Sequence, residues 1–211
     1  MDNSLQKLLS ELETFGQSND RNTNDRSQRM LNITRDTGEF LSVLIRATNA
    51  QRVLEIGTSN GYSTLWMGDA CRAVGGSVTT VELSEQKFKM AKKNFELSNL
   101  SSIIHQCLCN AGGFLSESED NAYDLVFLDS ERSEYSSWWS DIKRVIRPGG
   151  LLVVDNAISQ PDEIAPFISL IESDPDFTTS LVPVGKGEYL ATRSIKSHFH
   201  ESYSFGGCYG E

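Results

Sequence analysis

The central part of the chain alternates short, wholly apolar runs with longer stretches in which apolar residues recur every three or four positions. "DLVFLD" and "LLVVD" are typical of the runs, and strands this apolar suit a parallel sheet that is covered on both faces. Repeated strand–helix units of this kind predict a doubly wound α/β fold. The predicted strands are 52–56, 77–82, 103–108, 123–128 and 150–154, and the predicted helices are about 61–73, 84–98, 111–117, 133–146 and 161–173.

The two ends of the chain follow other patterns. Residues 4–15 carry an apolar stripe at helical spacing, and a second such stripe at 40–45 leads into the first strand. Between them, "QSNDRNTNDRSQR" (17–29) has no apolar residue and predicts a linker or mobile loop. Near the other end, "FTTSLVPVGKGEYLATR" (177–193) predicts two strands joined by a glycine-rich turn. We therefore expect a mostly parallel, seven-stranded sheet with a C-terminal antiparallel hairpin.

These patterns divide the chain into three segments. Residues 1–30 form an N-terminal helix and polar loop, 31–195 the α/β domain, and 196–211 a tail without clear period that could be disordered. The stripe at 5–15 has little obvious core of its own in the sequence. It could therefore pack across a two-fold axis, which would make the protein a homodimer.

Composition and charge narrow the classes of function. The chain has 211 residues, 38% of them hydrophobic and 23% charged, as expected for one soluble globular domain. No apolar run approaches the ~18 residues of a membrane span, and "MDNSLQKLLSELETF" lacks the layout of a secretion signal. The net charge of −10 argues against nucleic acid as the main partner. We expect a cytoplasmic protein without a membrane contact that acts on a small molecule.

A glycine-containing turn follows the first predicted strand, at the sheet edge where open α/β folds bind their ligands. In "VLEIGTSNGYST", Gly57 and Gly61 permit a tight turn and a close approach of a ligand to the backbone. The second strand ends in Glu82, where an acid can accept hydrogen bonds from both hydroxyls of a ribose. Together these features predict a nucleoside-type cofactor. The loop lacks the middle glycine of the dinucleotide fingerprint, and no Tyr-x-x-x-Lys pair is present, so a dehydrogenase is the weakest alternative.

Three oxygen-bearing side chains close the fourth and fifth predicted strands. Asp129 ends the fourth, and Asp155 and Asn156 end the fifth. Adjacent strands in this topology bring Asp129 and Asp155 close together, where their carboxylates would repel each other unless a cation lay between them. A hard divalent cation prefers oxygen ligands. Asn156 can join Asp155 only if the strand breaks at once, because strand neighbours point to opposite faces. The alternative is that Asp155 and Asn156 only cap the next helix.

Five motifs in this order and spacing resemble one enzyme family. "TGEFL", "EIGTSNGYS", "YDLVFLDSERSEY", "RPGGLLVVDN" and "VPVGKGEYLA" are similar to the class I S-adenosylmethionine-dependent O-methyltransferases of the catechol and caffeoyl-CoA O-methyltransferase group, over roughly residues 28–193. The resemblance implies a Rossmann-like methyltransferase fold and methyl transfer to a hydroxyl of a small, catechol-like or otherwise hydroxylated substrate. It implies a divalent cation (Mg²⁺, Mn²⁺ or Ca²⁺) on Asp129, Asp155 and Asn156. The implied cofactor contacts are Ile33, Glu55, Gly57, Thr58, Gly61, Ser63, Glu82, Ala111 and Asp129.

One position departs from the pattern of this group. Three residues after the metal-site Asp the group usually has Lys, and this chain has Arg132, which stays protonated and cannot accept a proton from a phenol. With Asp129, Arg132 is the candidate catalytic residue, where it would stabilise charge or bind a substrate acid. The departure keeps two alternatives open: a metal-independent methyltransferase with another acceptor atom, and a non-catalytic S-adenosylmethionine-binding protein.

Overall fold

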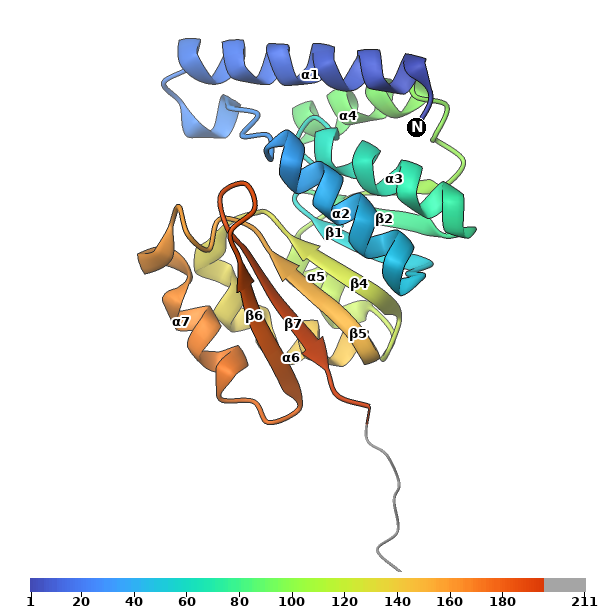
Figure 1. Cartoon of the computed structure of the whole chain (residues 1–211). Helices are drawn as coiled ribbons and strands as arrows, with labels where there is room; N and C mark the ends of the chain where they lie inside the picture. Colours follow the sequence, from blue (N-terminus) through green and yellow to red (C-terminus); the bar gives the residue numbers. More distant parts are fainter. Residues whose placement is uncertain (196–211) are drawn as a thin grey trace, which may run out of the picture.

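A seven-stranded sheet with helices on both faces runs through the computed structural model of the chain, which describes residues 1–195 (Figure 1). The predicted tail, 196–211, lies outside the described residues. Most strands coincide with the apolar runs of the sequence, because a central strand is buried on both of its faces. The strands are β1 (Arg52–Ile56), β2 (Ser77–Glu82), β3 (Ile104–Leu108), β4 (Tyr123–Leu128), β5 (Ile146–Val154), β6 (Phe177–Val182) and β7 (Glu188–Arg193).

The strand order across the sheet is β3-β2-β1-β4-β5-β7-β6, which confirms the predicted fold class. The first five strands are parallel, and β7 runs antiparallel to both β5 and β6. The order reverses between β1 and β4, where doubly wound sheets leave a crevice for ligands. The carboxyl ends of β1, β2, β4 and β5 therefore lie along one edge of the sheet.

The helices occupy the stretches with apolar residues at helical spacing, and side chains cap several of their first turns. Ser84 accepts a hydrogen bond from the N–H of Lys87, and Asn110 accepts one from the N–H of Gly113. The helices that follow strands β1 to β5 begin and end within two residues of the prediction. The helices are α1 (Asn3–Asn22), α2 (Arg35–Thr48), α3 (Tyr62–Val74), α4 (Glu85–Leu97), α5 (Ala111–Glu117), α6 (Tyr135–Val145) and α7 (Pro161–Glu172), with short 3-10 helices η1 (Arg26–Gln28) and η2 (Arg132–Glu134).

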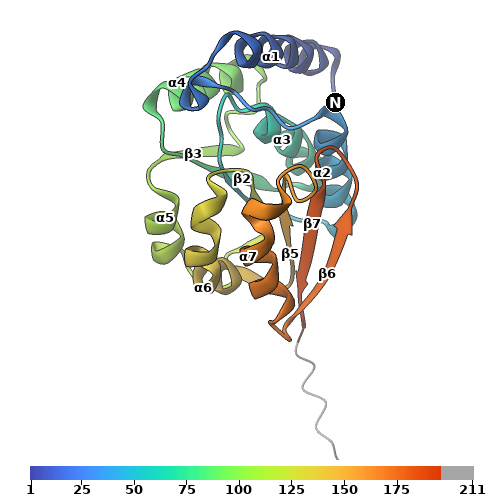
Figure 2. The ribbon, with the colours of Figure 1, turned by 90° about the vertical axis from the view of Figure 1, so that its left-hand side faces the viewer.

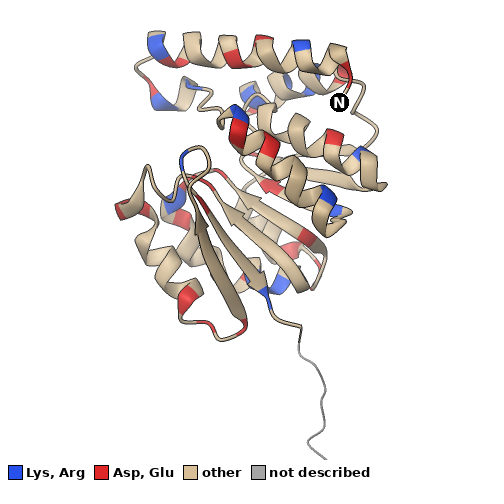
Figure 3. Ribbon diagram, viewed as in Figure 1, with Lys and Arg blue, Asp and Glu red and all other residues tan. Residues whose placement is uncertain are grey.

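Two hydrophobic cores lie on the two faces of the sheet, and the ribbon shows the helices that cover each face (Figures 1 and 2). Helices α1 to α4 bury residues such as Leu41, Met67 and Phe95 on one face. Helices α5 to α7 bury Ile142 and Phe167, among others, on the opposite face. Lys, Arg, Asp and Glu lie mainly on helices and in turns, and the strands carry few of them (Figure 3). Within residues 1–195, no helix has the length and apolar character needed to cross a lipid bilayer.

The prediction for β5 was too short, because this strand begins at Ile146 and not at residue 150. The segment "RPGG" looks like a turn in the sequence, but it continues the strand through an irregularity. There the pairing with β4 shifts register between Tyr123 and Leu125. Gly149 has φ = 74°, a conformation that glycine adopts at bulges with little strain.

The prediction of a linker or mobile loop over 17–29 was wrong for its first part. Helix α1 extends to Asn22, and residues 26–28 form η1. Hydrogen bonds hold the polar end of α1 to the following segment: the carboxylate of Asp20 accepts from the N–H groups of Met30 (2.7 Å) and Leu31 (2.9 Å). These bonds bring the following segment back against the helix.

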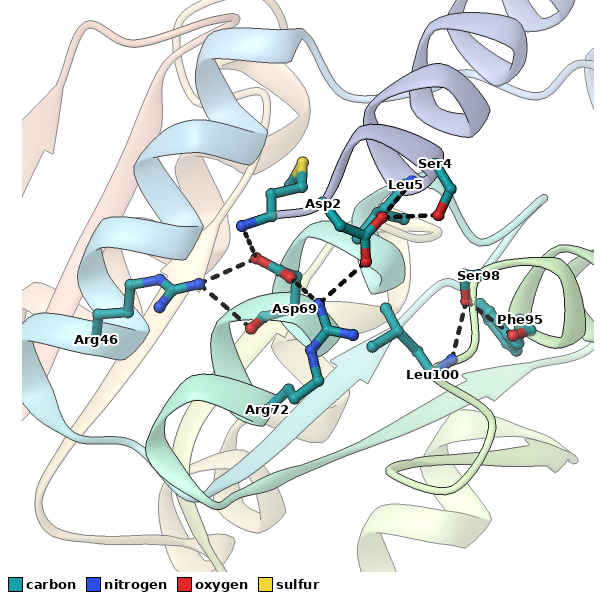
Figure 4. A network of polar contacts seen from close by, with 10 residues as sticks. Asp2, Ser4, Leu5, Arg46, Asp69, Arg72, Phe95, Ser98 and Leu100 are labelled. Carbon is teal, nitrogen blue, oxygen red and sulfur yellow. Dashed lines mark hydrogen bonds and ion pairs between the residues drawn. The ribbon is translucent and has the colours of Figure 1, made fainter.

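The apolar stripe of α1 also has a core within the same chain, contrary to the expectation. Leu5 and Leu9 are fully buried, and α1 packs against α3. At the N-terminal end of this contact, the buried carboxylate of Asp69 on α3 binds Arg46, Arg72 and the terminal amine of Met1 (Figure 4). The stripe therefore gives no reason to expect a homodimer, whose existence stays a prediction.

Candidate functional site

A cavity of about 1200 Å³ lies at the carboxyl ends of the parallel strands. Its wall consists of the loops that follow β1, β2, β3, β4 and β5, the turn between β6 and β7, and residues of the 26–33 segment. Pockets for one drug-sized ligand measure ~300–1,000 Å³. The cavity is therefore large enough for two small molecules side by side.

The structure brings most of the predicted site residues to this cavity, but not all of them. Glu55, Gly61 and Asp155 do not line it. Glu55 lies beneath the loop after β1, Gly61 against α4, and Asp155 behind Asn156. The predicted residues that line the cavity are Ile33, Gly57, Thr58, Ser63, Glu82, Ala111, Asp129, Arg132 and Asn156.

Glu82, the last residue of β2, holds its carboxylate at the cavity wall by two backbone hydrogen bonds. The N–H of Ser59 donates to Oε2 and the N–H of Ser84 donates to Oε1, both at 2.8 Å. Each carboxylate oxygen can accept a further hydrogen bond. The side chain is therefore fixed in place and still able to accept two hydrogen bonds from a ligand.

Glu55, in the middle of the sheet, supports the glycine loop from below. Its carboxylate accepts hydrogen bonds from the hydroxyls of Ser63, Thr64 and Thr80. Burial raises the pKa of Glu55 to about 7, although these hydrogen bonds oppose the rise. Because its oxygens are occupied by the protein, Glu55 positions Ser63 and does not itself reach the cavity. The expected contact of Glu55 with the cofactor stays a prediction.

The two glycines of the loop allow close packing within the protein. A Cβ on Gly57 (φ = 109°) would lie 2.1 Å from the carbonyl oxygen of Asp129. A Cβ on Gly61 (φ = 86°), the N-cap of α3, would lie 2.5 Å from the ring of Phe95. Gly57 thus lets the loops after β1 and β4 touch at the cavity, whereas Gly61 seats α3 against α4.

Asp155 and Asn156 do face the same side, as the sequence required of a ligand pair. Strand β5 ends at Val154, and Asn156 adopts a left-handed conformation with φ = 72°, which Asn tolerates better than most residues. Its Nδ2 donates to Asp155 Oδ2 at 2.6 Å and lies 3.5 Å from Asp129 Oδ1. The N-cap of α7 is Gln160, so neither residue caps the next helix.

The neighbouring carboxylates of Asp129 and Asp155 destabilise each other in their ionised forms. Burial, and then the charge of Asp155, raise the pKa of Asp129 well above its usual value. Burial also raises the pKa of Asp155. The positive charges of Lys186 and Arg132 oppose both rises. A further positive charge bound beside the two carboxylates would therefore favour their ionised forms.

Sequence reasoning missed two charged residues of the hairpin, Glu188 and Lys186. Glu188 is fully buried, and the hydroxyl of Thr37 donates to its Oε1 at 2.9 Å. Burial and the charge of Asp155 raise the pKa of Glu188 to about 10. Strands β5 and β7 pair Val154 with Tyr189, and the next pair in this register places Asp155 opposite Glu188. This register was the signal that could have revealed Glu188, because opposite residues of an antiparallel pair share a face.

The donor set fits a divalent cation by its chemistry. Two carboxylates and one amide supply hard oxygen ligands, and the crowded negative charge favours a cation. Among residues 1–195, no three His, Cys, Asp or Glu side chains form a group that could hold a metal ion, so a cation here would depend on Asn156. In this arrangement the Asn156 Oδ1 accepts from Ser159 Oγ at 3.2 Å. Rotation of the amide would turn that oxygen toward the carboxylates.

Comparison with known proteins places this geometry in context. The family described as "O-methyltransferase" matches residues 5–194. A relative named "Putative O-methyltransferase" from Mycobacterium sp. (strain JLS) is 30% identical over 174 residues, 76% of this chain and 79% of that protein. The "Catechol O-methyltransferase" of Niastella koreensis is 31% identical over 131 residues, 61% of this chain and 59% of that protein. The crystal structure of an O-methyltransferase from Bacillus cereus in complex with SAH has the same fold, with a TM-score of 0.75 at 24% identity, and the match covers 89% of this chain and 91% of that one.

Proposed function

The chain belongs to the O-methyltransferase family, and we propose that it transfers the methyl group of S-adenosylmethionine to a hydroxyl of a small molecule with the help of a divalent cation. The observation that carries this proposal is the arrangement of one cavity. Glu82 lies on its wall after β2, and Asp129 and Asn156 lie on its wall after β4 and β5. A nucleoside cofactor and a hydroxylated acceptor can therefore be bound next to each other.

The proposed cofactor site uses the residues around the loop after β1. Glu82 accepts hydrogen bonds from the ribose hydroxyls, since both of its oxygens keep a free acceptor position. The loop from Gly57 to Ser63 lies beside the methionine part of the cofactor, where the N-terminus of α3 favours a carboxylate. Ile33, Thr58, Ala111 and Asp129 complete the wall around the cofactor.

The proposed acceptor site uses the residues after β4 and β5. Asp129, Asp155 and, after rotation of its amide, Asn156 are the ligands of the cation. A bound cation would lower the pKa of an acceptor hydroxyl and orient its oxygen. Arg132, held by Glu163, adds positive charge next to Asp129 and would stabilise negative charge on the acceptor.

Calorimetric titration of S-adenosylhomocysteine into the protein tests the cofactor site. Charge-assisted hydrogen bonds contribute about 1.5–3 kcal/mol, so Glu82→Gln should weaken binding by about 10- to 100-fold. Glu119→Gln, which changes an exposed acid on the opposite side of the fold, should bind as the wild type does. Wild-type protein that binds no S-adenosylhomocysteine would contradict the proposal as a whole.

A separate titration with Mg²⁺ tests the cation site. Heat of binding is expected for the wild type and should be lost in Asp155→Asn, which keeps the shape of the side chain and removes its charge. S-adenosylhomocysteine should still bind to this variant, because Asp155 does not line the cavity. Equal heats in the two proteins would contradict the assigned ligands.

One observation favours a metal-independent methyltransferase as the second candidate. The Asn156 Nδ2 already donates to Asp155 and points at Asp129, and Lys186 supplies a positive charge nearby. These groups could hold the carboxylates without a metal ion. Methylation of catechol that is unchanged by a chelator would favour this candidate, and loss of methylation with chelator would exclude it.

A further inference from the structure

The turn between β6 and β7 is fastened to the loop that carries Asn156. The carbonyl of Lys186 accepts hydrogen bonds from the N–H groups of Ile158 (3.1 Å) and Ser159 (3.0 Å). The carbonyl of Gly187 accepts one from the N–H of Ala157 at 2.9 Å. Three consecutive N–H groups after Asn156 thus hold the turn, which fixes the backbone of Lys186 relative to the proposed acceptor site.

The other side of this turn rests on the beginning of α2. The N–H of Gly185 donates to Asp36 Oδ2 at 3.1 Å. A Cβ on Gly185 would lie 2.1 Å from Thr37 Oγ1 and 2.5 Å from Thr34 Oγ1, so the turn touches the helix without room for a side chain. Because it is clamped from two sides, the turn presents Lys186 to the cavity in a defined position.

The ammonium group of Lys186 faces the cavity with donors to spare. Its Nζ donates to the carbonyl of Asn32 at 3.3 Å, and the side chain lines the cavity together with Asp129 and Asn156. Its charge opposes the rise in the pKa of both Asp129 and Asp155. Within the described part of the chain, however, Lys186 forms no ion pair with a carboxylate. An ammonium group has three hydrogens to donate, so two remain for a ligand.

Arg132, the other cation beside the carboxylates, is already committed to a partner. Its Nε and Nη2 both bind Glu163 Oε2 at 2.7 Å, and its side chain is only 7% exposed. A guanidinium held in this way is less free to follow a ligand than the Lys186 ammonium. Of these two cations, Lys186 is therefore the one whose charge has no carboxylate partner within residues 1–195.

We propose that Lys186 binds the acceptor substrate through an anionic oxygen. This role makes Lys186 a catalytic residue in addition to Arg132, the candidate that the sequence indicated. This inference rests on the proposed methyltransferase function. The anionic oxygen is either the ionised hydroxyl that receives the methyl group or a carboxylate beside it on the acceptor. A fixed positive charge at this point stabilises the negative charge of the acceptor beside the carboxylates of Asp129 and Asp155.

The charge balance of the transfer agrees with this role. The hydroxyl loses its proton to water and reacts as an oxyanion. An oxygen lone pair then forms the new O–C bond, the S–C bond breaks, and its electron pair stays on sulfur. The sulfonium and the oxyanion thus become a neutral thioether and a neutral ether. Lys186 keeps its own protons and serves only to stabilise and position the oxyanion.

Steady-state kinetics with S-adenosylmethionine and Mg²⁺ on two acceptors test the inference. Catechol carries only hydroxyls, and protocatechuate adds a carboxylate. For Lys186→Met we expect kcat/KM to fall by about 100-fold, the scale of losing one donor to a developing oxyanion. Lys186→Arg should recover much of this loss because it restores the charge. Lys93→Met, which alters an exposed lysine of α4, is the matched control and should behave as the wild type does.

The two acceptors identify which oxygen Lys186 meets. A fall in kcat on both acceptors assigns it to the oxygen that is methylated. A rise in KM on protocatechuate alone assigns it to the carboxylate. In either case the calorimetric affinity for S-adenosylhomocysteine should be unchanged, because the cofactor contacts lie on the other loops.

Several results would overturn the inference. One is a kcat/KM of Lys186→Met within about twofold of the wild type. Another is an equal loss in Lys186→Met and Lys186→Arg together with lower thermal stability, which would assign Lys186 a structural role in the turn. If the wild type binds S-adenosylhomocysteine but methylates neither acceptor, protocatechuate is titrated into that complex. Equal affinities for wild type and Lys186→Met would then refute the inference, and no binding would refute the acceptor class, while the cofactor site would stand.

Discussion

Alanine substitutions at three glycines distinguish the cost of a left-handed backbone conformation from the cost of a steric clash. Gly57 has φ = 109°, and a Cβ there would lie 2.1 Å from the carbonyl oxygen of Asp129, well inside the 3.0 Å limit of real Cβ contacts. Gly75, after α3, has φ = 71° with nothing within 4 Å of a Cβ. Gly113, inside α5, has open space around it and no positive φ. Substitution by Ala therefore adds both backbone strain and a clash at Gly57, backbone strain alone at Gly75, and neither at Gly113.

The expected changes in the free energy of unfolding follow from these differences. Gly113→Ala should stabilise the protein by about 0.5–1 kcal/mol, because Gly is unfavourable inside a helix. Gly75→Ala should destabilise it by about 1 kcal/mol, since the left-handed strain is partly offset by a less flexible unfolded chain. Gly57→Ala adds an overpacking cost of about 1–3 kcal/mol to the strain, which gives about 3 kcal/mol in total. For a domain of this size, that corresponds to a fall in Tm of about 6–12 °C.

Urea unfolding followed by circular dichroism measures the three stabilities, and calorimetry measures S-adenosylhomocysteine binding. Gly57→Ala should also bind the cofactor product more weakly, because relief of the clash moves the loops after β1 and β4 apart. Gly75→Ala and Gly113→Ala should bind it as the wild type does. If Gly57→Ala were no less stable than Gly75→Ala, the close contact between Gly57 and Asp129 would not exist in solution and the reasoning would fail.

Three further predictions concern the support of the site. Leu9→Ala should lower the free energy of unfolding by about 2–5 kcal/mol at every protein concentration, because Leu9 is buried within one chain. Light scattering that shows the loss of a dimer in this variant would contradict the prediction. Asp69→Asn should lower the free energy of unfolding in urea by about 1–2 kcal/mol, a modest value because Arg46 and Arg72 are 41% exposed and can be solvated. An unchanged urea midpoint would disprove a stabilising role for the ion pairs of Asp69. Burial raises the pKa of Glu55 from 4.5 to about 7, so the folded state binds the proton more tightly than the unfolded state does. The contribution of this proton to the free energy of unfolding is fully present below pH 4.5, and about 3 kcal/mol of it is lost as the pH rises to about 7. Between these pH values, urea unfolding of Glu55→Gln should therefore show a smaller fall in stability than that of the wild type.

The sheet could be predicted from the sequence because its central strands are buried on both faces. A strand such as Tyr123–Leu128 has to be apolar almost throughout, and that run is visible without any knowledge of its neighbours. Its carboxyl end is visible for the same reason, since the apolar run stops at Asp129. The positions of Glu82, Asp129 and Asn156 at one edge of the sheet followed from the parallel topology alone.

The sequence pattern does not report the burial and the contacts of every segment. The end of α1 is polar because it is exposed, so the pattern looked like that of a loop, and the hydrogen bonds from Met30 and Leu31 to Asp20 were not visible. Glu55 precedes the glycine loop directly, and only the structure shows that its carboxylate turns inward to Ser63 and its neighbours. Side-chain direction at a strand end depends on contacts with other elements, which spacing along one chain does not encode.

The hairpin shows how distant segments complete a site whose main residues were predictable. Its glycine-rich turn appears in the sequence as a way to end the sheet, yet the antiparallel register with β5 brings Glu188 next to Asp155 and the turn brings Lys186 to the cavity. Neither position has a periodicity that marks it, because a register depends on two strands at once. The same register explains why the cluster favours positive charge: burial raises the pKa of three neighbouring acids, Asp129, Asp155 and Glu188, and the charge of Lys186 opposes this rise for Asp129 and Asp155. A substrate oxyanion that enters this cluster must meet a fixed cation, and the clamped backbone of Lys186 supplies one at that point.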